Sequence, residues 1–420
     1  MRAVSRLANR AARQMWLARN SAAFRDTETR RRPRLLVDVS VIMRHDAATG
    51  IQRVVRSIWS HLRILEGRDF DVLPVHAGRS RGYCFAPGDF LMPDSRPGHI
   101  PVGVRPGDKF LGLDLSAHYL PNYIDQLAAW KSNGASLHFV IYDLLPLTRP
   151  DWFMPSTSRN FARWLDTVAT IGDQALCISD TVVQELGRRI IGTPAHERLT
   201  VGRLHLSGDI AGSLPSAGLS LEVRSVLARL QSRPSILMIG TIEPRKGYDR
   251  ALDAFSLLWD SDGDTAPDLV IIGKRGWKTA ALQERIRNHP QHGQRLHWLE
   301  NVSDEALTKF YGAALGVFIA SYDEGFGLPL VEAARHRRWV LARDLPVFAG
   351  QRLLNVIYFS HDSPDALAHD LRDLVRVASG GLPPTTNSPK WSWCVERLIE
   401  EIGLAREAGT GQPPALRLVS

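Results

Sequence analysis

From residue 34 onwards, short apolar runs alternate with segments whose apolar positions recur at helical spacing. Runs such as 35–40 and 137–143 suit buried strands, whereas 50–65 and 159–170 have the periodicity of helices. Strands and helices that alternate in this way predict a parallel sheet covered on both faces. The alternation pauses near residue 206 and restarts at 235, so we expect an α/β protein with two doubly wound, Rossmann-like domains.

The stretch between the two units is rich in glycine, serine and proline, a composition typical of linkers. A second Pro/Gly-rich stretch lies near the last residues and predicts a loose tail. The expected organisation is an N-terminal arm at 1–33, a first domain at 34–206, a linker at 207–233, a second domain at 234–388, a helical segment at 389–403 and a tail at 404–420.

The composition is that of a globular protein, with 44% hydrophobic and 23% charged residues among 420. Cys84, Cys177 and Cys394 lie far apart and lack the paired spacing of a disulfide framework or a zinc site. No run of 18 apolar residues predicts a membrane-spanning helix, and no apolar core of a secretory signal is present near residue 1. We therefore expect a cytoplasmic protein without a metal site.

The net charge of +8 is concentrated in residues 1–34, which hold ten arginines against Asp26 and Glu28. The rest of the chain is balanced, so it does not predict the basic stripe of a nucleic-acid-binding protein. On a helix, Arg2 and Arg6 fall on one face and Leu7 on the other, as in segments that bind anionic lipid surfaces. We expect residues 1–32 to hold the protein on the inner face of the cytoplasmic membrane; the alternative is a solvated, arginine-rich tail.

One stretch combines a strand, a glycine loop and a helix start. An apolar run at 315–320 precedes Glu324, and two glycines at 325 and 327 lead to a helix expected to begin at Leu328. Amides at such a helix start favour an anion such as a phosphate. Glu324 lies in the loop and Glu332 about one turn into the helix, so both carboxylates can reach the crevice beside this helix start. The alternative is a surface loop with two solvated glutamates.

A second loop at 240–247 also joins an expected strand to an expected helix. It carries Arg245 and Lys246, which together can neutralise a pyrophosphate, one through a planar fork and the other as a point charge. Loops that follow the carboxyl ends of parallel strands lie at the ligand-binding edge of a sheet. Taken by itself, the loop would be interpreted as a solvated turn with two exposed basic side chains.

Four motifs in the second half, at 240–247, 272–277, 302–307 and 324–332, resemble the nucleotide-sugar-binding domain of the retaining glycosyltransferases of family 4. Those enzymes have the GT-B architecture. The first half is similar more loosely, through segments at 49–53, 142–146 and 177–181. The resemblance also implies that a helix near 391–393 crosses back to the first domain.

The resemblance implies roles for particular residues. Arg245 and Lys246 would hold the donor diphosphate, and the helix start at Gly50 would face it. Glu332 would bind the ribose, and Glu324, Tyr142 and Asp143 would act as catalytic residues. Tyr142 departs from the family, which has a histidine there and hence a possible cation. The amides expected to assist at the diphosphate belong to Gly325, Phe326, Gly327 and Leu328.

The function implied by the resemblance is retaining transfer of a hexose from a nucleotide sugar. GDP-mannose is the favoured donor, no metal is required, and the acceptor is a growing lipid-linked surface glycan such as lipopolysaccharide or exopolysaccharide. A nucleotide-sugar epimerase or a phosphorylase would share the fold. A non-catalytic adaptor that uses the arginine arm on a membrane is a further alternative.

Overall fold

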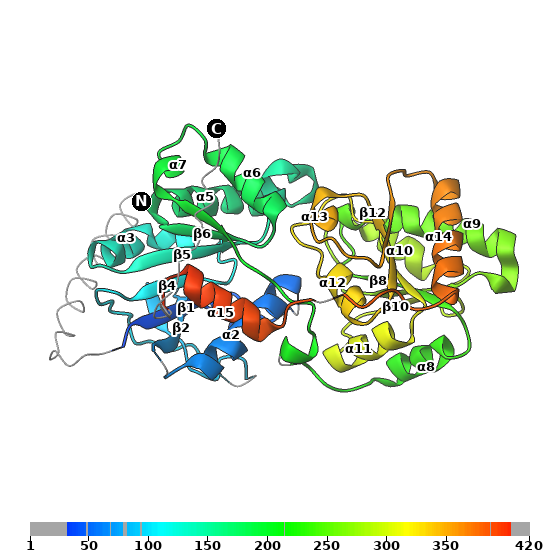
Figure 1. Cartoon of the computed structure of the whole chain (residues 1–420), viewed down its shortest axis with the longest axis horizontal. Helices are drawn as coiled ribbons and strands as arrows, with labels where there is room; N and C mark the ends of the chain where they lie inside the picture. The colour runs from blue at the N-terminus through cyan, green and yellow to red at the C-terminus, as the bar shows by residue number, and fades with distance from the viewer. Residues whose placement is uncertain are drawn as a thin grey trace, which may run out of the picture.

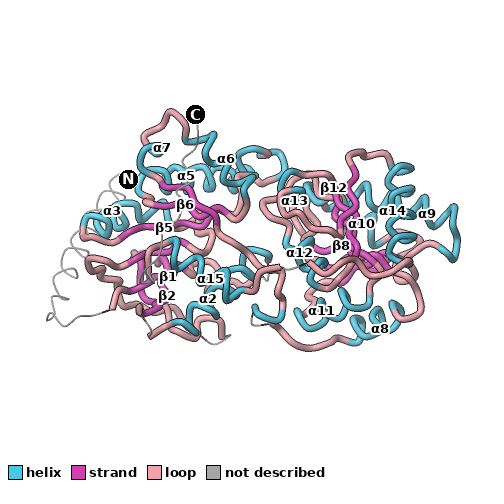
Figure 2. Tube along the Cα trace, viewed as in Figure 1, coloured by secondary structure: helices cyan, strands magenta, loops and turns pink. Residues whose placement is uncertain are grey.

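The computed structural model describes residues 32–404 except 48, 68, 79–81, 93–94, 214 and 387. The predicted basic arm, up to residue 31, and the predicted tail from residue 405 lie outside the described residues. The rest of the chain forms two α/β domains beside each other, and each has its strands between helices (Figures 1 and 2). The predicted fold class is therefore confirmed.

The first domain is built on a seven-stranded sheet of order β3-β2-β1-β4-β5-β6-β7. All neighbours are parallel except β3, which runs antiparallel to β2. Its strands are β1 (Arg34–Asp38), β2 (Asp71–Ala77), β3 (Tyr83–Phe85), β4 (Lys109–Gly112), β5 (Ser136–Ile141), β6 (Gln174–Cys177) and β7 (Thr200–Arg203). Its helices are α2 (Gly50–Leu65), α3 (Ile124–Ser132), α4 (Leu145–Thr148), α5 (Pro155–Ile171), α6 (Asp180–Ile190) and α7 (Ala195–Arg198).

The second domain has a six-stranded parallel sheet of order β10-β9-β8-β11-β12-β13. Its strands are β8 (Ser235–Ile239), β9 (Asp268–Ile272), β10 (Leu296–Leu299), β11 (Gly316–Ile319), β12 (Trp339–Arg343) and β13 (Val356–Phe359). Its helices are α8 (Leu221–Leu230), α9 (Tyr248–Asp262), α10 (Ala280–Arg287), α11 (Asp304–Ala313), α12 (Leu328–Arg335), α13 (Pro346–Ala349) and α14 (Pro364–Ser379).

Local sequence signals explain where the helices nearest the cleft begin. Thr49 and Gln52 form a capping box at the start of α2, so that backbone amides there are satisfied by side chains. Gly327 has a φ of 85°, and Pro329 lies in the first turn of α12, where its missing amide hydrogen costs nothing. Both helices begin where the sequence predicts.

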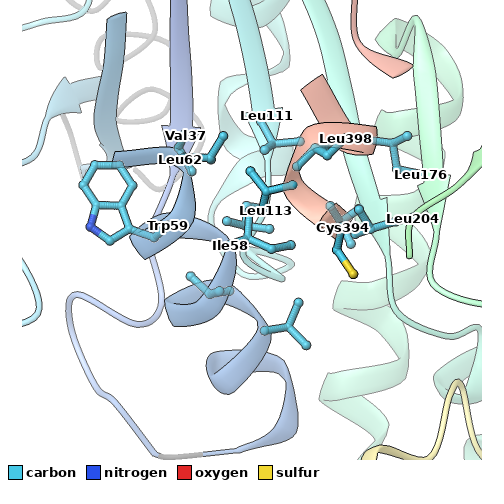
Figure 3. Packing of buried hydrophobic residues seen from close by; sticks show 14 of the residues in the cluster. Val37, Ile58, Trp59, Leu62, Leu111, Leu113, Leu176, Leu204, Cys394 and Leu398 are labelled. Atoms are coloured by element: carbon cyan, nitrogen blue, oxygen red, sulfur yellow. The ribbon is translucent and has the colours of Figure 1, made fainter. Parts of the chain in front are cut away.

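The helix α15 (Trp391–Glu401) follows the second domain in the chain but packs on the first. Its Cys394 and Leu398 lie in the same buried apolar cluster as Ile58 and Leu62 of α2 (Figure 3). The crossing helix implied by the resemblance is therefore present. It joins the last described part of the chain to the core of the first domain (Figure 1).

The segment between the domains differs from the expected linker at 207–233. Within it, α8 buries Val223, Val226 and Leu230 against Leu237 of β8. This part of the segment is a layer of the second domain rather than a linker, because its apolar face has the helical spacing that a flexible connection lacks. None of the described helices is long and apolar enough to cross a membrane.

Candidate active site

Sheet topology brings the two predicted loops together. The Glu324 loop follows β11, and the short 3-10 helix Pro244–Lys246 follows β8. β8 and β11 are neighbours, and connections leave them toward opposite edges of the sheet. A crevice forms at such a switch point, at the carboxyl ends of the strands. The two loops therefore meet at the position where α/β proteins bind their ligands.

Glu324 is paired with both cations of the other loop. Its Oε2 accepts a hydrogen bond of 2.6 Å from Arg245 Nη1, and its Oε1 accepts from Lys246 Nζ. Ser321 Oγ donates a third hydrogen bond of 2.8 Å. Burial alone would raise the pKa of Glu324, but the two cations outweigh it and lower the pKa to about 2. Glu324 is therefore an anion at neutral pH.

Asp143 reaches this charge cluster from the first domain. Burial raises its pKa to about 6, although Arg245 opposes the rise. Arg245 itself donates through Nε to Glu243 Oε2 at 3.0 Å, so its guanidinium serves two carboxylates. The structure thus brings Asp143, Glu324, Arg245 and Lys246 to one place, as the sequence predicts. A carboxyl group that titrates near neutrality in a cleft is a candidate for proton transfer.

The glycine loop touches the first domain directly. A Cβ added to Gly325 would lie 2.2 Å from the carbonyl oxygen of Tyr142 and 3.0 Å from Cβ of Asp143. Gly325 is therefore required by a close approach between the domains rather than by its backbone torsions. Gly327 differs, because its φ is positive and an added Cβ would lie 2.4 Å from the Phe348 ring.

The position of Tyr142 contradicts its prediction as a catalytic residue. Its side chain is buried in the core of the first domain, and its hydroxyl donates to the carbonyl oxygen of Leu113 at 2.8 Å. Burial raises the pKa of the Tyr142 hydroxyl well above its ordinary value. The part of Tyr142 that lies close to Gly325 of the second domain is its backbone carbonyl. The apolar surroundings favour an aromatic side chain directed inward, and the sequence motif did not reveal this direction.

Glu332 lies within the same cleft but is paired with a residue that sequence reasoning did not single out. Its Oε1 accepts from Arg53 Nη1 of α2, and its Oε2 accepts from the Tyr311 hydroxyl at 2.8 Å. Arg53 also donates to Asp304 Oδ1 at 3.0 Å. Arg53 closes the predicted segment 49–53, but a lone arginine gave no signal for a partner 279 residues away.

Two helix starts face one another beside these charges. A Cβ added to Gly50 at the start of α2 would lie 3.5 Å from Leu328 Cδ1 at the start of α12. The N-terminal ends of both helices, which carry the positive ends of their dipoles, therefore lie close together between the domains. Phe326 and Val331 of the second domain also join the buried apolar cluster of the first. This arrangement suits an anionic group bound between the domains.

A further contact bridges the domains through the loop after β9. Trp277 Nε1 donates to the carbonyl oxygen of Trp152 at 2.7 Å, and Lys278 Nζ donates to the carbonyl of Asp151. A small cavity of about 10 Å³ beside Glu324 and Lys246 is lined by residues of the second domain. Among the described residues, no cluster of three or more histidines, cysteines or carboxylates could hold a metal ion.

Comparison with known proteins identifies the second domain. Residues 222–377 match the family described as "Glycosyl transferases group 1". The second domain belongs to this family. We call it the group 1 domain below. The match includes the Arg245 loop, the Glu324 loop and α12, which are the parts of this domain that form the site.

Several curated relatives that the chain matches are named as mannosyltransferases. It is 35% identical over 378 residues to "Serotype-specific mannosyltransferase WbdA" of Escherichia coli, which covers 88% of this chain and 44% of the relative. It is 30% identical over 192 residues to "O-antigen chain mannosyltransferase B" of Escherichia coli. That match covers 46% of this chain and 49% of the relative. The chain thus spans less than half the length of these relatives.

Solved structures with the same architecture support the fold. The Anabaena protein Alr3699/HepE, solved in complex with UDP and glucose, superposes with a TM-score of 0.59 at 14% identity, over 88% of this chain and 99% of HepE. An α,α-trehalose-phosphate synthase from Burkholderia xenovorans gives a TM-score of 0.50 at 14% identity, over 70% and 72% of the two chains. The group 1 domain and its partner domain together have the GT-B fold.

Proposed function

We propose that the protein is a retaining glycosyltransferase that moves mannose from GDP-mannose to a growing, lipid-linked surface polysaccharide. The observation that carries the proposal is the pairing of Glu324 with Arg245 and Lys246 at the switch point of the second sheet. The similarity to mannosyltransferases over most of the chain supports the transferred sugar. The donor is a substrate, and no metal is part of the proposal.

The charges in the cleft suit the departure of a nucleoside diphosphate. Negative charge grows on the diphosphate as its bond to the sugar breaks, so cations and helix amides aimed there stabilise the transition state more than the ground state. Arg245, Lys246 and the amides at 325–328 supply these groups. Glu324 lies beside the two cations and would contact the sugar, and Glu332 would bind the ribose.

Of the two residues predicted to be catalytic in the first domain, Asp143 and not Tyr142 is the one that we assign this role. It faces the Glu324 cluster from the first domain, which would bring the acceptor. With a pKa of about 6, Asp143 is largely ionised at neutral pH and can accept a proton from an acceptor hydroxyl, whereas burial raises the pKa of Tyr142 and keeps its hydroxyl protonated. In a retaining transfer this hydroxyl attacks the face of the sugar that the diphosphate leaves.

The donor base and the site of action are further parts of the proposal. HepE was solved with UDP and glucose, and its likeness to this chain concerns the fold. GDP-mannose is favoured here because two of the similar curated proteins, WbdA and the O-antigen chain mannosyltransferase B, are named as mannosyltransferases. Attachment of residues 1–32 to an anionic membrane, at its cytoplasmic face, would place the enzyme where lipid-linked acceptors reside.

The test uses the full chain with a donor and a soluble mannosyl acceptor. Lys246→Ala and Glu324→Ala are expected to lower turnover by about 100-fold or more, the range seen when one preorganised charge is lost. Arg285→Ala is the matched control, because Arg285 is exposed and pairs with Asp253 away from the cleft. An NMR assignment of the product anomer tests retention.

Other outcomes would contradict the proposal. Unchanged turnover in both variants would overturn the assignment of the active site. Transfer from UDP-glucose but not from GDP-mannose would overturn the donor. An epimerised sugar nucleotide formed without acceptor would indicate an epimerase. Loss of function on removal of residues 1–30, with no transfer by the intact chain, would indicate a membrane adaptor.

A further inference from the structure

Arg53 joins the two domains through a buried ion-pair cluster. It extends from the first turns of α2 in the first domain to two carboxylates of the second. Glu332 is 1% exposed and Asp304 is 6% exposed, so both are shielded from water. A buried carboxylate without a partner is costly, and breaking such a pair from one side leaves that cost uncompensated. The arginine therefore favours contact between the domains.

The two carboxylates are fixed from the side opposite Arg53. Glu332 accepts from the Tyr311 hydroxyl, and Asp304 Oδ2 accepts from the amide and the hydroxyl of Ser216 at 2.9 and 2.8 Å. Tyr311 belongs to the second domain and Ser216 to the segment that connects the domains. Separating the domains would therefore break the two ion pairs of Arg53, while the hydrogen bonds from Tyr311 to Glu332 and from Ser216 to Asp304 stay intact.

The bond between Arg53 and Glu332 occupies a carboxylate that the proposed function assigns to the ribose. Glu332 Oε1 accepts from Arg53 and Oε2 accepts from Tyr311, so both oxygens are already engaged. A ribose hydroxyl therefore reaches Oε1 only after Arg53 has left it.

We propose that Arg53 is an interdomain latch: it holds the cleft closed through Glu332 and Asp304, and it is released when the nucleotide binds. The inference rests on the proposed function for the identity of the ligand. A ligand that binds only when the Arg53 bond is broken has an apparent affinity reduced by the fraction of molecules in which that bond is broken. The latch lowers that fraction, and with it the affinity for any nucleotide.

The experiment compares Arg53→Ala, Arg53→Lys and the unmodified chain. In the absence of nucleotide, small-angle scattering should show a larger radius of gyration for Arg53→Ala. Calorimetric titration should show that GDP binds about tenfold more tightly to it, within the range of coupling between sites. Arg53→Lys should lie between, because an ammonium group cannot bridge two carboxylates with a planar fork.

The matched control is Arg63→Ala on the same helix, where Arg63 pairs with Glu66 of the first domain. It should change neither measurement. An unchanged radius and affinity in Arg53→Ala would overturn the latch, and weaker GDP binding would make Arg53 a donor-binding residue instead. If Arg53→Ala does not fold, Arg53→Lys decides between these outcomes.

The result can be separated from failure of the proposed function. If the unmodified chain binds neither GDP nor UDP, the proposed donor site is wrong, whereas the scattering comparison still tests the latch without any ligand. If the chain binds a nucleotide and Arg53→Ala binds it no more tightly, the proposed function stands and the latch is wrong.

Discussion

At the scale of single residues, the charge of Glu324 depends on two neighbours rather than on water. Burial opposes ionisation, but Arg245 and Lys246 outweigh it and hold the pKa at about 2. The same two cations are the proposed diphosphate ligands. Glu324 and a diphosphate therefore compete for the same positive charge, and a change at Glu324 should affect binding and turnover in opposite directions.

Glu324→Gln separates these two effects. The amide keeps the size of the side chain and removes its charge, so Arg245 and Lys246 are left with more positive charge for a diphosphate. We expect GDP to bind at least as tightly as in the unmodified chain, while turnover falls by about 100-fold. Calorimetry and initial rates measure the two quantities. Weaker GDP binding in this variant would contradict the competition.

Asp114 gives a pH dependence of stability. It follows β4, its Oδ2 accepts from the amides of Val41 and Ile42, and burial together with nearby Asp38 raises its pKa to about 7. The pKa in the unfolded chain is near 3.8. The native state thus binds more protons between these values, so the stabilising contribution is complete below pH 3.8 and is lost as pH rises through 7.

Asp114→Asn should remove this dependence, because an amide oxygen can accept the same two hydrogen bonds without ionising. Between pH 5 and pH 7 we expect the free energy of unfolding of the unmodified chain to fall by about 2 kcal/mol relative to the variant. Urea unfolding at the two pH values measures the difference. Parallel pH profiles for the two proteins would contradict the prediction.

At the scale of elements, the loop before α12 shows that two glycines in one motif serve different purposes. Gly325 allows the loop to approach the backbone of Tyr142, whereas Gly327 adopts a left-handed conformation ahead of the helix. The sequence predicts the loop from both glycines alike. Only the structure assigns one to the contact between domains and the other to the helix start.

Gly327→Ala should destabilise the protein. A side chain at a φ of 85° is strained, and its Cβ would meet the Phe348 ring. We expect a loss of about 1–3 kcal/mol in the free energy of unfolding. Gly312→Ala in α11 is the matched comparison, because Gly312 has open space around it and helical torsions; it should gain about 0.4–1 kcal/mol. Thermal or urea unfolding measures both changes in the free energy of unfolding, and changes of the same sign in the two variants would contradict this account.

At the scale of the whole molecule, α15 ties the two domains into one unit. It follows the second domain in sequence, and its apolar face completes the core of the first (Figure 3). Leu398 is 1% exposed in that core. The chain therefore passes between the domains twice, through the connecting segment and through the segment that leads to α15, which restricts how the domains can separate.

Leu398→Ala should weaken the first domain although the residue lies far along the chain. Truncation of a buried leucine costs about 2–5 kcal/mol, since transfer free energy is lost and a cavity remains. Glu396→Ala, on the exposed face of the same helix, should change the free energy of unfolding by less than about 0.5 kcal/mol. Urea unfolding of both variants measures this, and equal losses would contradict the packing of α15.

The sequence by itself determined the elements and the loops of the site. Apolar periodicity and caps act within a few residues, so α2 and the start of α12 could be predicted where they occur. The pairing of the Arg245 and Glu324 loops also followed, because parallel strands place their carboxyl ends at one edge. By contrast, a helix hidden in the expected linker was missed, since glycine and proline around α8 masked its short apolar face.

Only the tertiary structure decided what faces what across the cleft. Tyr142 turns into the core and leaves Asp143 in the site, and Arg53 pairs with Glu332 from the other domain. The direction of Tyr142 depends on packing within the first domain, whereas the partner of Arg53 depends on how the two domains are oriented. That orientation is set by contacts between residues far apart in sequence, and no local pattern of hydrophobic and polar positions encodes it.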